Sequence, residues 1–185
     1  MSDRSINTIC VYCGSRPGAD PRFAQAATEL GREMARRGIG LVYGGGHVGL
    51  MGVIADAVLD AGGEAVGVIP RFMVESERAH PGLTEQIVVE TMHQRKQIMS
   101  DRCDAIITMP GGVGTFDELF EAITWNVLSV HDRPIGVLDV GGYYEPLKSL
   151  IDHGVAGGFI DPDVARALHW SREAPTLLDA LLKSD

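Results

Sequence analysis

The chain alternates between short apolar runs and longer stretches in which apolar residues are spaced apart. The runs are about four or five residues long and lie at residues 8–12, 39–43, 65–69, 86–89, 105–109 and 135–138. Such runs are typical of strands buried on both faces of a parallel sheet. In the longer stretches apolar residues recur every three or four positions, which is the spacing of an amphipathic helix. The pattern therefore predicts strands and helices in alternation.

Capping residues and glycines set the ends of the expected helices. Asp20 and Pro21 are typical of a helix start, and Gly38 closes that helix at Arg37. Residues 71–82 are irregular and charged, which predicts a loop over the strand ends. Further helices are expected at residues 48–59, 92–99, 144–153 and 175–183, with a short one after Asp161-Pro162 and one after the glycines that follow residue 109. This order predicts right-handed crossovers and a Rossmann-like three-layer α/β sandwich around a mostly parallel sheet.

The glycine-rich turn at residues 110–114 (PGGVG) lies between an expected strand and an expected helix. Glycines lack Cβ, so a ligand can approach the backbone, and a helix start leaves N–H groups without intrahelical partners. Together with the positive end of the helix dipole, these donors favour a phosphate. The turn is not a P-loop, because no lysine follows Gly114, and it lies too late in the chain for the dinucleotide fingerprint. An ordinary strand-to-helix turn is the alternative.

Four motifs lie between residues 43 and 118. They are residues 43–46 (YGGG), 49–52 (GLMG), 92–96 (MHQRK) and 110–118 (PGGVGTFDE). In order and spacing they resemble the LOG family, the cytokinin riboside 5′-monophosphate phosphoribohydrolases, long labelled "possible lysine decarboxylase". The resemblance implies one nucleotide-binding α/β domain over residues 1–185. It also implies hydrolysis of the N-glycosidic bond of a purine nucleoside 5′-monophosphate without a cofactor, releasing ribose 5-phosphate. Adenine and N6-substituted adenine both remain open as the base.

The same resemblance implies roles for individual residues. Arg95 and Glu118 match the family's catalytic arginine and glutamate, and the sequence does not divide the roles between them. From the residues alone, Thr115 and Glu118 also fit a capping box, and Arg95 with Lys96 also fits a solvated helix face. Substrate contacts are implied for Ser15, Gly45, Glu77, Met92, Lys96, Gly112, Val113, Gly114, Thr115, Phe116, Asp117 and Thr124.

Two of these substrate contacts have simpler explanations. From the residues alone, Glu77 also fits an exposed surface charge. Thr124 also fits a helix residue whose hydroxyl donates to the backbone of its own helix.

Composition narrows the classes of function. The net charge of −9 argues against binding to nucleic acid or to an anionic membrane, so an anionic substrate needs a local positive pocket. There is no apolar run long enough for a membrane span and no apolar stretch of a signal peptide, so we expect a cytoplasmic protein. Cys10, Cys13 and Cys103 are expected to be buried reduced thiols. The six histidines show no ligand spacing, so no metal is expected.

The helix after the glycine turn carries more large apolar residues than one buried stripe needs. This excess predicts a homodimer or a higher homo-oligomer, which the resemblance also implies, and it favours Phe120 and Trp125 as core or interface residues. Three other functions compete with hydrolysis. A noncatalytic nucleotide-binding protein is the main alternative. A lysine decarboxylase would need pyridoxal phosphate on Lys96, the only lysine near the motifs, and a phosphotransferase would need the Walker lysine that is missing here.

Overall fold

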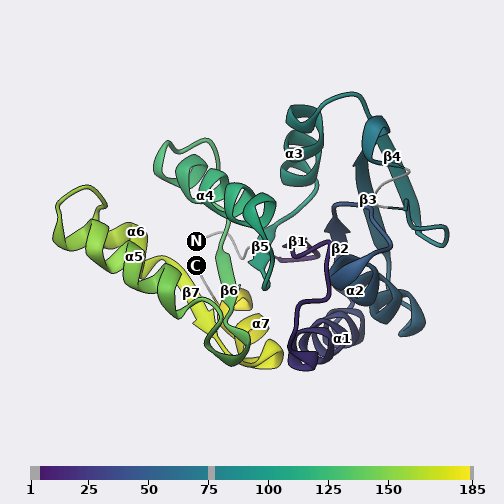
Figure 1. The fold of residues 1–185 in the computed structure, drawn as a ribbon, viewed down its shortest axis with the longest axis horizontal. Helices are drawn as coiled ribbons and strands as arrows, with labels where there is room; N and C mark the ends of the chain where they lie inside the picture. Colours follow the sequence, from purple (N-terminus) through teal and green to yellow (C-terminus); the bar gives the residue numbers. More distant parts are fainter. Residues whose placement is uncertain (1–4, 75–77, 184–185) are drawn as a thin grey trace.

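The computed structural model describes residues 5–74 and 78–183, and its centre is a seven-stranded sheet (Figure 1). Every pair of neighbouring strands in this sheet is parallel. The sheet order is β4-β3-β2-β1-β5-β6-β7. The strands are β1 (Thr8–Tyr12), β2 (Gly40–Tyr43), β3 (Ala65–Pro70), β4 (Glu85–Val89), β5 (Ala105–Thr108), β6 (Ile135–Leu138) and β7 (Leu168–Ser171).

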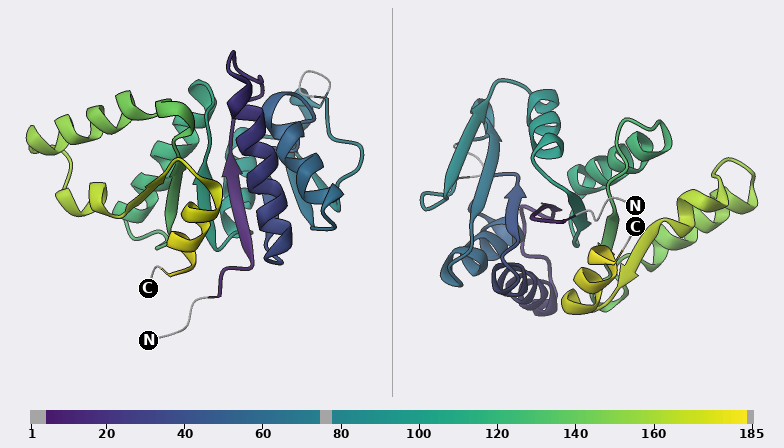
Figure 2. Two further views of the ribbon diagram at one scale, coloured as in Figure 1. Left: turned by 90° about the horizontal axis from the view of Figure 1, so that it is seen from below. Right: turned by 180° about the vertical axis from the view of Figure 1, so that it is seen from behind.

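Helices cover both faces of the sheet, which confirms the expected three-layer α/β class. One face carries α1, α2 and α7, and the other carries α3, α4 and α5. In both views of Figure 2, α5 and α6 extend beyond the edge of the sheet as an arm. The helices are α1 (Pro21–Arg36), α2 (Gly49–Asp60), α3 (Met92–Asp101), α4 (Val113–Val127), α5 (Glu145–Ala156), α6 (Pro162–Arg166) and α7 (Ala174–Leu182), with 3₁₀ turns η1 (Arg71–Met73) and η2 (Val140–Gly142).

The strand order contains a topological switch between β1 and β5. From β1 the chain moves outward through β2 and β3 to β4, and it then returns to place β5 on the other side of β1. The loops that leave the carboxyl ends of β1 and β5 therefore diverge. In open α/β sheets a crevice forms at such a point, and ligands bind there.

The six strands expected from the apolar runs are all present, with ends within one residue of the prediction. The seventh strand, β7, was not predicted. Its sequence, LHWS, has one buried leucine followed by three half-buried residues, because β7 is an edge strand that pairs only with β6. A four-residue edge strand of this kind has neither an apolar run nor a clear alternation, so pattern alone does not find it.

Two expectations from composition also have structural outcomes. Cys10, Cys13 and Cys103 are buried thiols, as expected. None of the described helices is both long enough and apolar enough to cross a membrane. The cytoplasmic location stays a prediction.

Candidate active site

A cavity of about 650 Å³ lies at the topological switch. Its walls are the loops after β1, β2 and β5 together with parts of α2, α3 and α4. This volume is within the range of small-molecule sites. The cavity brings together nine of the residues predicted from sequence, which are Ser15, Met92, Arg95, Gly112, Val113, Gly114, Thr115, Asp117 and Glu118.

The glycine loop presents free backbone donors to this cavity. The N-cap of α4 is Gly112, which has no side chain to cap the helix. The first intrahelical hydrogen bond runs from Phe116 N to Gly112 O (3.1 Å). The N–H groups of Val113, Gly114 and Thr115 therefore precede the intrahelical ladder. These donors, at the positive end of a 15-residue helix, make an anion site.

The glycines of the loop serve two different purposes. A Cβ added to Gly112 or Gly114 would meet no other atom within 4 Å, so the space in front of this backbone is open. A Cβ on Gly111 would collide with the Thr115 hydroxyl and would lie 2.9 Å from Gly14 N. Gly111 is thus required for packing within the loop, whereas Gly112 and Gly114 leave room for a ligand.

Glu118 lines the cavity two positions beyond Phe116 on the same helix. Because the N-cap is Gly112, Thr115 is the third helical residue and not the cap, so the capping-box explanation of Glu118 is wrong. Tyr12 also lines the cavity. Burial, followed by the charges of Cys10 and Glu118, raises the pKa of Tyr12, so this phenol stays protonated near the carboxylate.

Arg95 is buried beneath the cavity, with only 5% of its surface exposed, so the solvated-face explanation is wrong for this residue. Its Nε donates to Val68 O (3.0 Å) and its Nη2 donates to Gly44 O (2.8 Å). The sulfurs of Met73 and Met92 lie 3.9 and 4.0 Å from Nη1. A Cβ on Gly44 would collide with Nη2, so the glycine after β2 is what admits the guanidinium.

The start of α3 fixes the position of Arg95 along the chain. A capping box closes this helix start: Gln94 N donates to Thr91 Oγ1 (3.1 Å) and Thr91 N donates to Gln94 Oε1 (3.2 Å). Such reciprocal bonds satisfy two donors that the helix itself leaves free. Because Arg95 directly follows Gln94, the capping box fixes the backbone end of the Arg95 side chain, and the two backbone carbonyls fix its guanidinium end.

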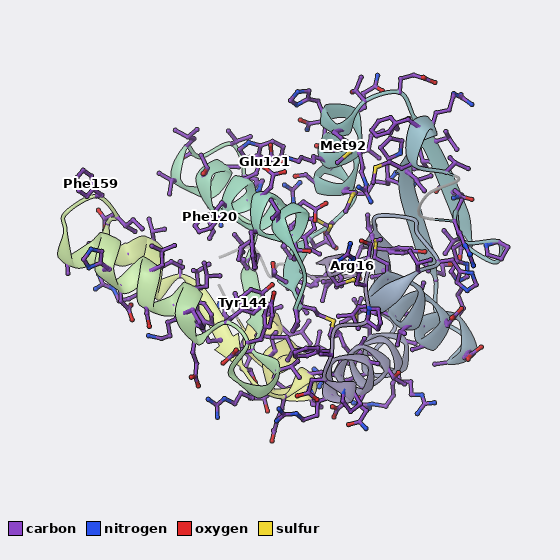
Figure 3. The ribbon with its side chains drawn as sticks, viewed as in Figure 1. Arg16, Met92, Phe120, Glu121, Tyr144 and Phe159 are labelled. Carbon is purple, nitrogen blue, oxygen red and sulfur yellow. The ribbon has the colours of Figure 1, made fainter. Side chains whose placement is uncertain are left out.

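Lys96 lies in a different environment from its neighbour. Its ammonium is 2.6 Å from Asp117 Oδ2 and 3.4 Å from Glu121 Oε1, and the side chain is mostly buried. Partial burial acts to lower the pKa of Lys96, but the two carboxylates outweigh it and raise the pKa above its ordinary value. Lys96 therefore links α3 to α4, and Figure 3 shows Glu121 on the side of α4 nearer α3.

Three other predicted substrate contacts within the described residues do not line the cavity. Gly45 is buried after β2, Phe116 packs edge-on against Tyr144 at 6.2 Å, and the exposed Thr124 donates its hydroxyl to Phe120 O at 2.7 Å. The bond of Thr124 is the simple explanation given above, and its role in binding stays a prediction. Glu77 lies outside the described residues.

Several proteins of known name are similar to this chain in sequence over most of its length. A family profile described as "Possible lysine decarboxylase" matches residues 51–181. The cytokinin riboside 5′-monophosphate phosphoribohydrolase LOG of Oryza sativa subsp. japonica is 46% identical over 175 residues, which are 95% of this chain and 71% of that protein. The phosphoribohydrolase of Rhodococcoides fascians is 49% identical over 156 residues, 84% of this chain and 79% of that protein. The chain belongs to the LOG family.

Solved structures show that the LOG family fold is shared more widely. The Moco carrier protein of Chlamydomonas reinhardtii superposes with a TM-score of 0.72 at 20% identity, covering 97% of this chain and 99% of that one. The molybdenum cofactor binding protein of Rippkaea orientalis gives a TM-score of 0.70 at 20% identity, with 95% of both chains covered. At this level of identity the likeness concerns the fold alone.

Arg16 and Tyr143 are among the residues of this LOG-family cavity that were not predicted from sequence. Arg16 lines it from the loop after β1, and Tyr143 lines it from the turn after β6. Arg16 could have been found, because Gly14 and Ser15 had already marked that strand end as a ligand position. No sequence signal points to Tyr143, since its place depends on how β6 and β5 pair.

A cluster of His47, Asp56 and His80 lies outside the cavity lining, and its ligand atoms lie within 4.8 Å of one another. Sequence spacing did not reveal it, because the three residues come from separate segments. His80 Nε2 is 2.9 Å from Asp56 Oδ1, and Gly82 N donates to His80 Nδ1 (3.1 Å). That bond requires a lone pair on Nδ1, so the ring proton of a neutral His80 is on Nε2 and faces Asp56. A metal at Nε2 would need the opposite tautomer.

Proposed function

We propose that this chain hydrolyses the N-glycosidic bond of purine nucleoside 5′-monophosphates, with adenine or an N6-substituted adenine as the base. The named LOG-family relatives are phosphoribohydrolases of cytokinin riboside 5′-monophosphates. The observation that carries the proposal is one cavity that contains a glycine loop with free amides, the carboxyl group of Glu118 and the buried guanidinium of Arg95. AMP nucleosidase activity, in addition to release of cytokinins, is part of this proposal.

In this proposal the 5′-phosphate binds at the start of α4. The amides of Val113, Gly114 and Thr115 donate to its oxygens, and the open space in front of Gly112 and Gly114 admits them. Arg16, which lines the same cavity, adds a positive charge in a protein whose net charge is −9. A phosphate held in this way orients the attached ribose toward the next turn of the helix.

Glu118 lies four residues beyond Gly114, about 6 Å further along the helix axis at 1.5 Å per residue. The carboxylate can therefore face a ribose whose phosphate lies at the helix start. As the C1′–N9 bond breaks, positive charge develops on the sugar, and a nearby carboxylate stabilises it or takes a proton from the attacking water. Water adds its oxygen to C1′ and one of its protons goes to the departing base, so the products are the free purine and ribose 5-phosphate.

Arg95 acts on the same substrate from the α3 side. Its two bonds to backbone carbonyls hold the guanidinium in one orientation, and burial strengthens its field in the cavity. It orients the ribose or assists departure of the base.

The direct test is chromatography of AMP, isopentenyladenosine monophosphate and the two matching nucleosides after incubation with the protein. We expect free base and ribose 5-phosphate from the nucleotides, and far slower release from the nucleosides because these lack the phosphate. Binding of AMP without release of adenine from either nucleotide would support the noncatalytic alternative. Equal kcat/KM for AMP and adenosine would contradict the phosphate site.

We also propose that the chain forms a homodimer through α4 and the arm. Phe120, Val127 and Leu128 of α4 are 39%, 57% and 65% exposed, and Phe159 of the arm is 93% exposed. In Figure 3 Phe120 projects on the side of α4 toward α5, and Phe159 marks the end of the arm. Apolar surface of this extent on two neighbouring elements is typical of an interface between subunits.

Sedimentation tests the dimer. We expect a mass of twice 19.9 kDa at micromolar concentration, and dissociation in Phe120→Glu. Phe72→Glu is the control, since Phe72 is 66% exposed but lies on η1, away from the arm. A wild-type monomer, or equal dissociation by both variants, would contradict this interface.

A further inference from the structure

The peptide groups just before the phosphate loop are held by three separate donors. Tyr144 Oη donates to Met109 O (2.7 Å), Gly14 N donates to Pro110 O (3.1 Å), and Tyr143 Oη donates to Gly111 O (2.5 Å). Three consecutive carbonyls are thus bound by the loop after β1 and by the turn after β6. The last of them belongs to the peptide that joins Gly111 to Gly112, the N-cap of α4.

The orientation of this last peptide controls the phosphate site. In a trans peptide the N–H points opposite to the C=O, so a carbonyl bound by Tyr143 directs the Gly112 N–H away from that hydroxyl. Gly111 and Gly112 both line the cavity, and glycine backbones rotate easily when nothing holds them. We propose that Tyr143 is a positioning residue for the 5′-phosphate: it orients the Gly111–Gly112 peptide at the N-cap of α4, directly before the N–H groups of Val113, Gly114 and Thr115 that form the anion site. The inference rests on the proposed function.

The structure holds Tyr143 itself in place. Its ring packs edge-on against Phe23 (5.6 Å between centroids) and against Tyr144 (4.9 Å). The backbone N–H of Tyr144 donates to Asp139 Oδ1 at 2.6 Å, which fixes the start of the turn. Burial raises the pKa of Tyr144, so its hydroxyl stays a donor to Met109 O.

The turn that carries the two tyrosines depends on glycine. Gly141 and Gly142 have φ values of +64° and +81°, which place them in the left-handed region. This reversal after β6 brings Tyr143 and Tyr144 to the loop after β5, 32 and 35 residues earlier in the chain. The side chain of Tyr144 is fully buried and contributes to the core, whereas Tyr143 is 37% exposed. Tyr143 is therefore the residue whose hydroxyl can be removed with little effect on packing.

The test compares wild-type protein with Tyr143→Phe, which keeps the ring and removes the hydroxyl. We expect kcat/KM for AMP to fall roughly three- to tenfold, the scale of one hydrogen bond. In a Glu118→Gln background, in which AMP turns over far more slowly, calorimetry should show the Kd for AMP rising by a similar factor, while the Kd for adenine, which has no phosphate, stays unchanged. Thr28→Val is the control, because it removes a hydroxyl that donates to Ala24 O (3.0 Å) on α1, away from the cavity. This control should leave every value unchanged.

Two results would overturn the positioning role. Unchanged affinity and kcat/KM for AMP in Tyr143→Phe would show that the hydroxyl does not orient the site. An equal loss of affinity for AMP and adenine would show a general structural effect instead. Wild-type protein that binds AMP without cleaving it would refute the proposed function, yet the comparison of AMP with adenine affinity would still test Tyr143.

Discussion

Replacement of Gly114 by alanine should separate stability from activity. Gly114 is the second residue of α4, its φ is not in the left-handed region, and an added Cβ meets no atom within 4 Å. Alanine loses less backbone entropy on folding than glycine, so Gly114→Ala should stabilise the protein by about 0.4–1 kcal/mol. For a chain of this length, such a gain corresponds to a rise in Tm of roughly 1–4 °C.

The same methyl group would occupy the space through which the phosphate approaches the backbone. If it displaces the phosphate from one of the amides of α4, one hydrogen bond to a charged group is lost. Such a bond contributes about 1.5–3 kcal/mol, and this loss equals roughly a ten- to hundredfold decrease in kcat/KM. The expected variant is therefore more stable and less active, a combination that damage to the fold would not produce.

Thermal melts and release of adenine from AMP measure the two effects. Gly111→Ala is the contrasting variant, because its Cβ would collide with the Thr115 hydroxyl, so it should lose both stability and activity. If Gly114→Ala keeps kcat/KM for AMP within about twofold of wild type, far less than the expected loss, the phosphate does not bind at this backbone. A fall in Tm would show that the alanine is strained, which the geometry does not predict.

Three further predictions follow from the site and from α1. Glu118→Gln should lower kcat about a hundredfold or more. It should change the free energy of unfolding by less than about 1 kcal/mol, since Glu118 is not a cap. If the variant keeps a third of the wild-type kcat for release of adenine, Glu118 is not catalytic. Arg16→Ala should raise KM for AMP and weaken its dependence on salt, whereas Arg32→Ala on α1 should change neither. The Arg36 and Arg37 guanidiniums lower the pKa of Glu33 to about 2, so its ion pairs stabilise the fold above pH 4.5 and are lost as pH falls toward 2. When the free energy of unfolding is measured over this pH range, it should decrease less in Glu33→Gln than in wild type.

Much of the fold was predictable because the apolar pattern reports burial directly. A strand such as β5 is buried at every position, so a continuous apolar run identifies it without reference to the rest of the chain. The glycine loop was predictable for a similar reason, since the strand end, the glycines and the helix start are adjacent in sequence. The edge strand β7 was not, because half of its environment is solvent.

The environment of each charged side chain was harder to predict. Arg95 and Lys96 are neighbours, yet one guanidinium is buried on Gly44 O and Val68 O while the ammonium forms ion pairs with Asp117. The partners of Arg95 lie 51 and 27 residues away, directly after β2 and within β3. The sequence places both residues in one motif, but only the packing of α3 on the sheet separates the two roles.

The description of the family as a possible lysine decarboxylase does not fit the geometry around Lys96. A Schiff base requires an unprotonated amine at the reacting position. The carboxylates of Asp117 and Glu121 raise the pKa of Lys96 and favour its charged form, and deprotonation would leave two carboxylates close together without a cation. Neither Lys96 nor the other two lysines, Lys148 and Lys183, line the described cavity, whose cations are arginines. The same ion pairs give Lys96 a different use: they join α3 to α4, and so keep the helix that carries Arg95 in register with the helix that carries Glu118.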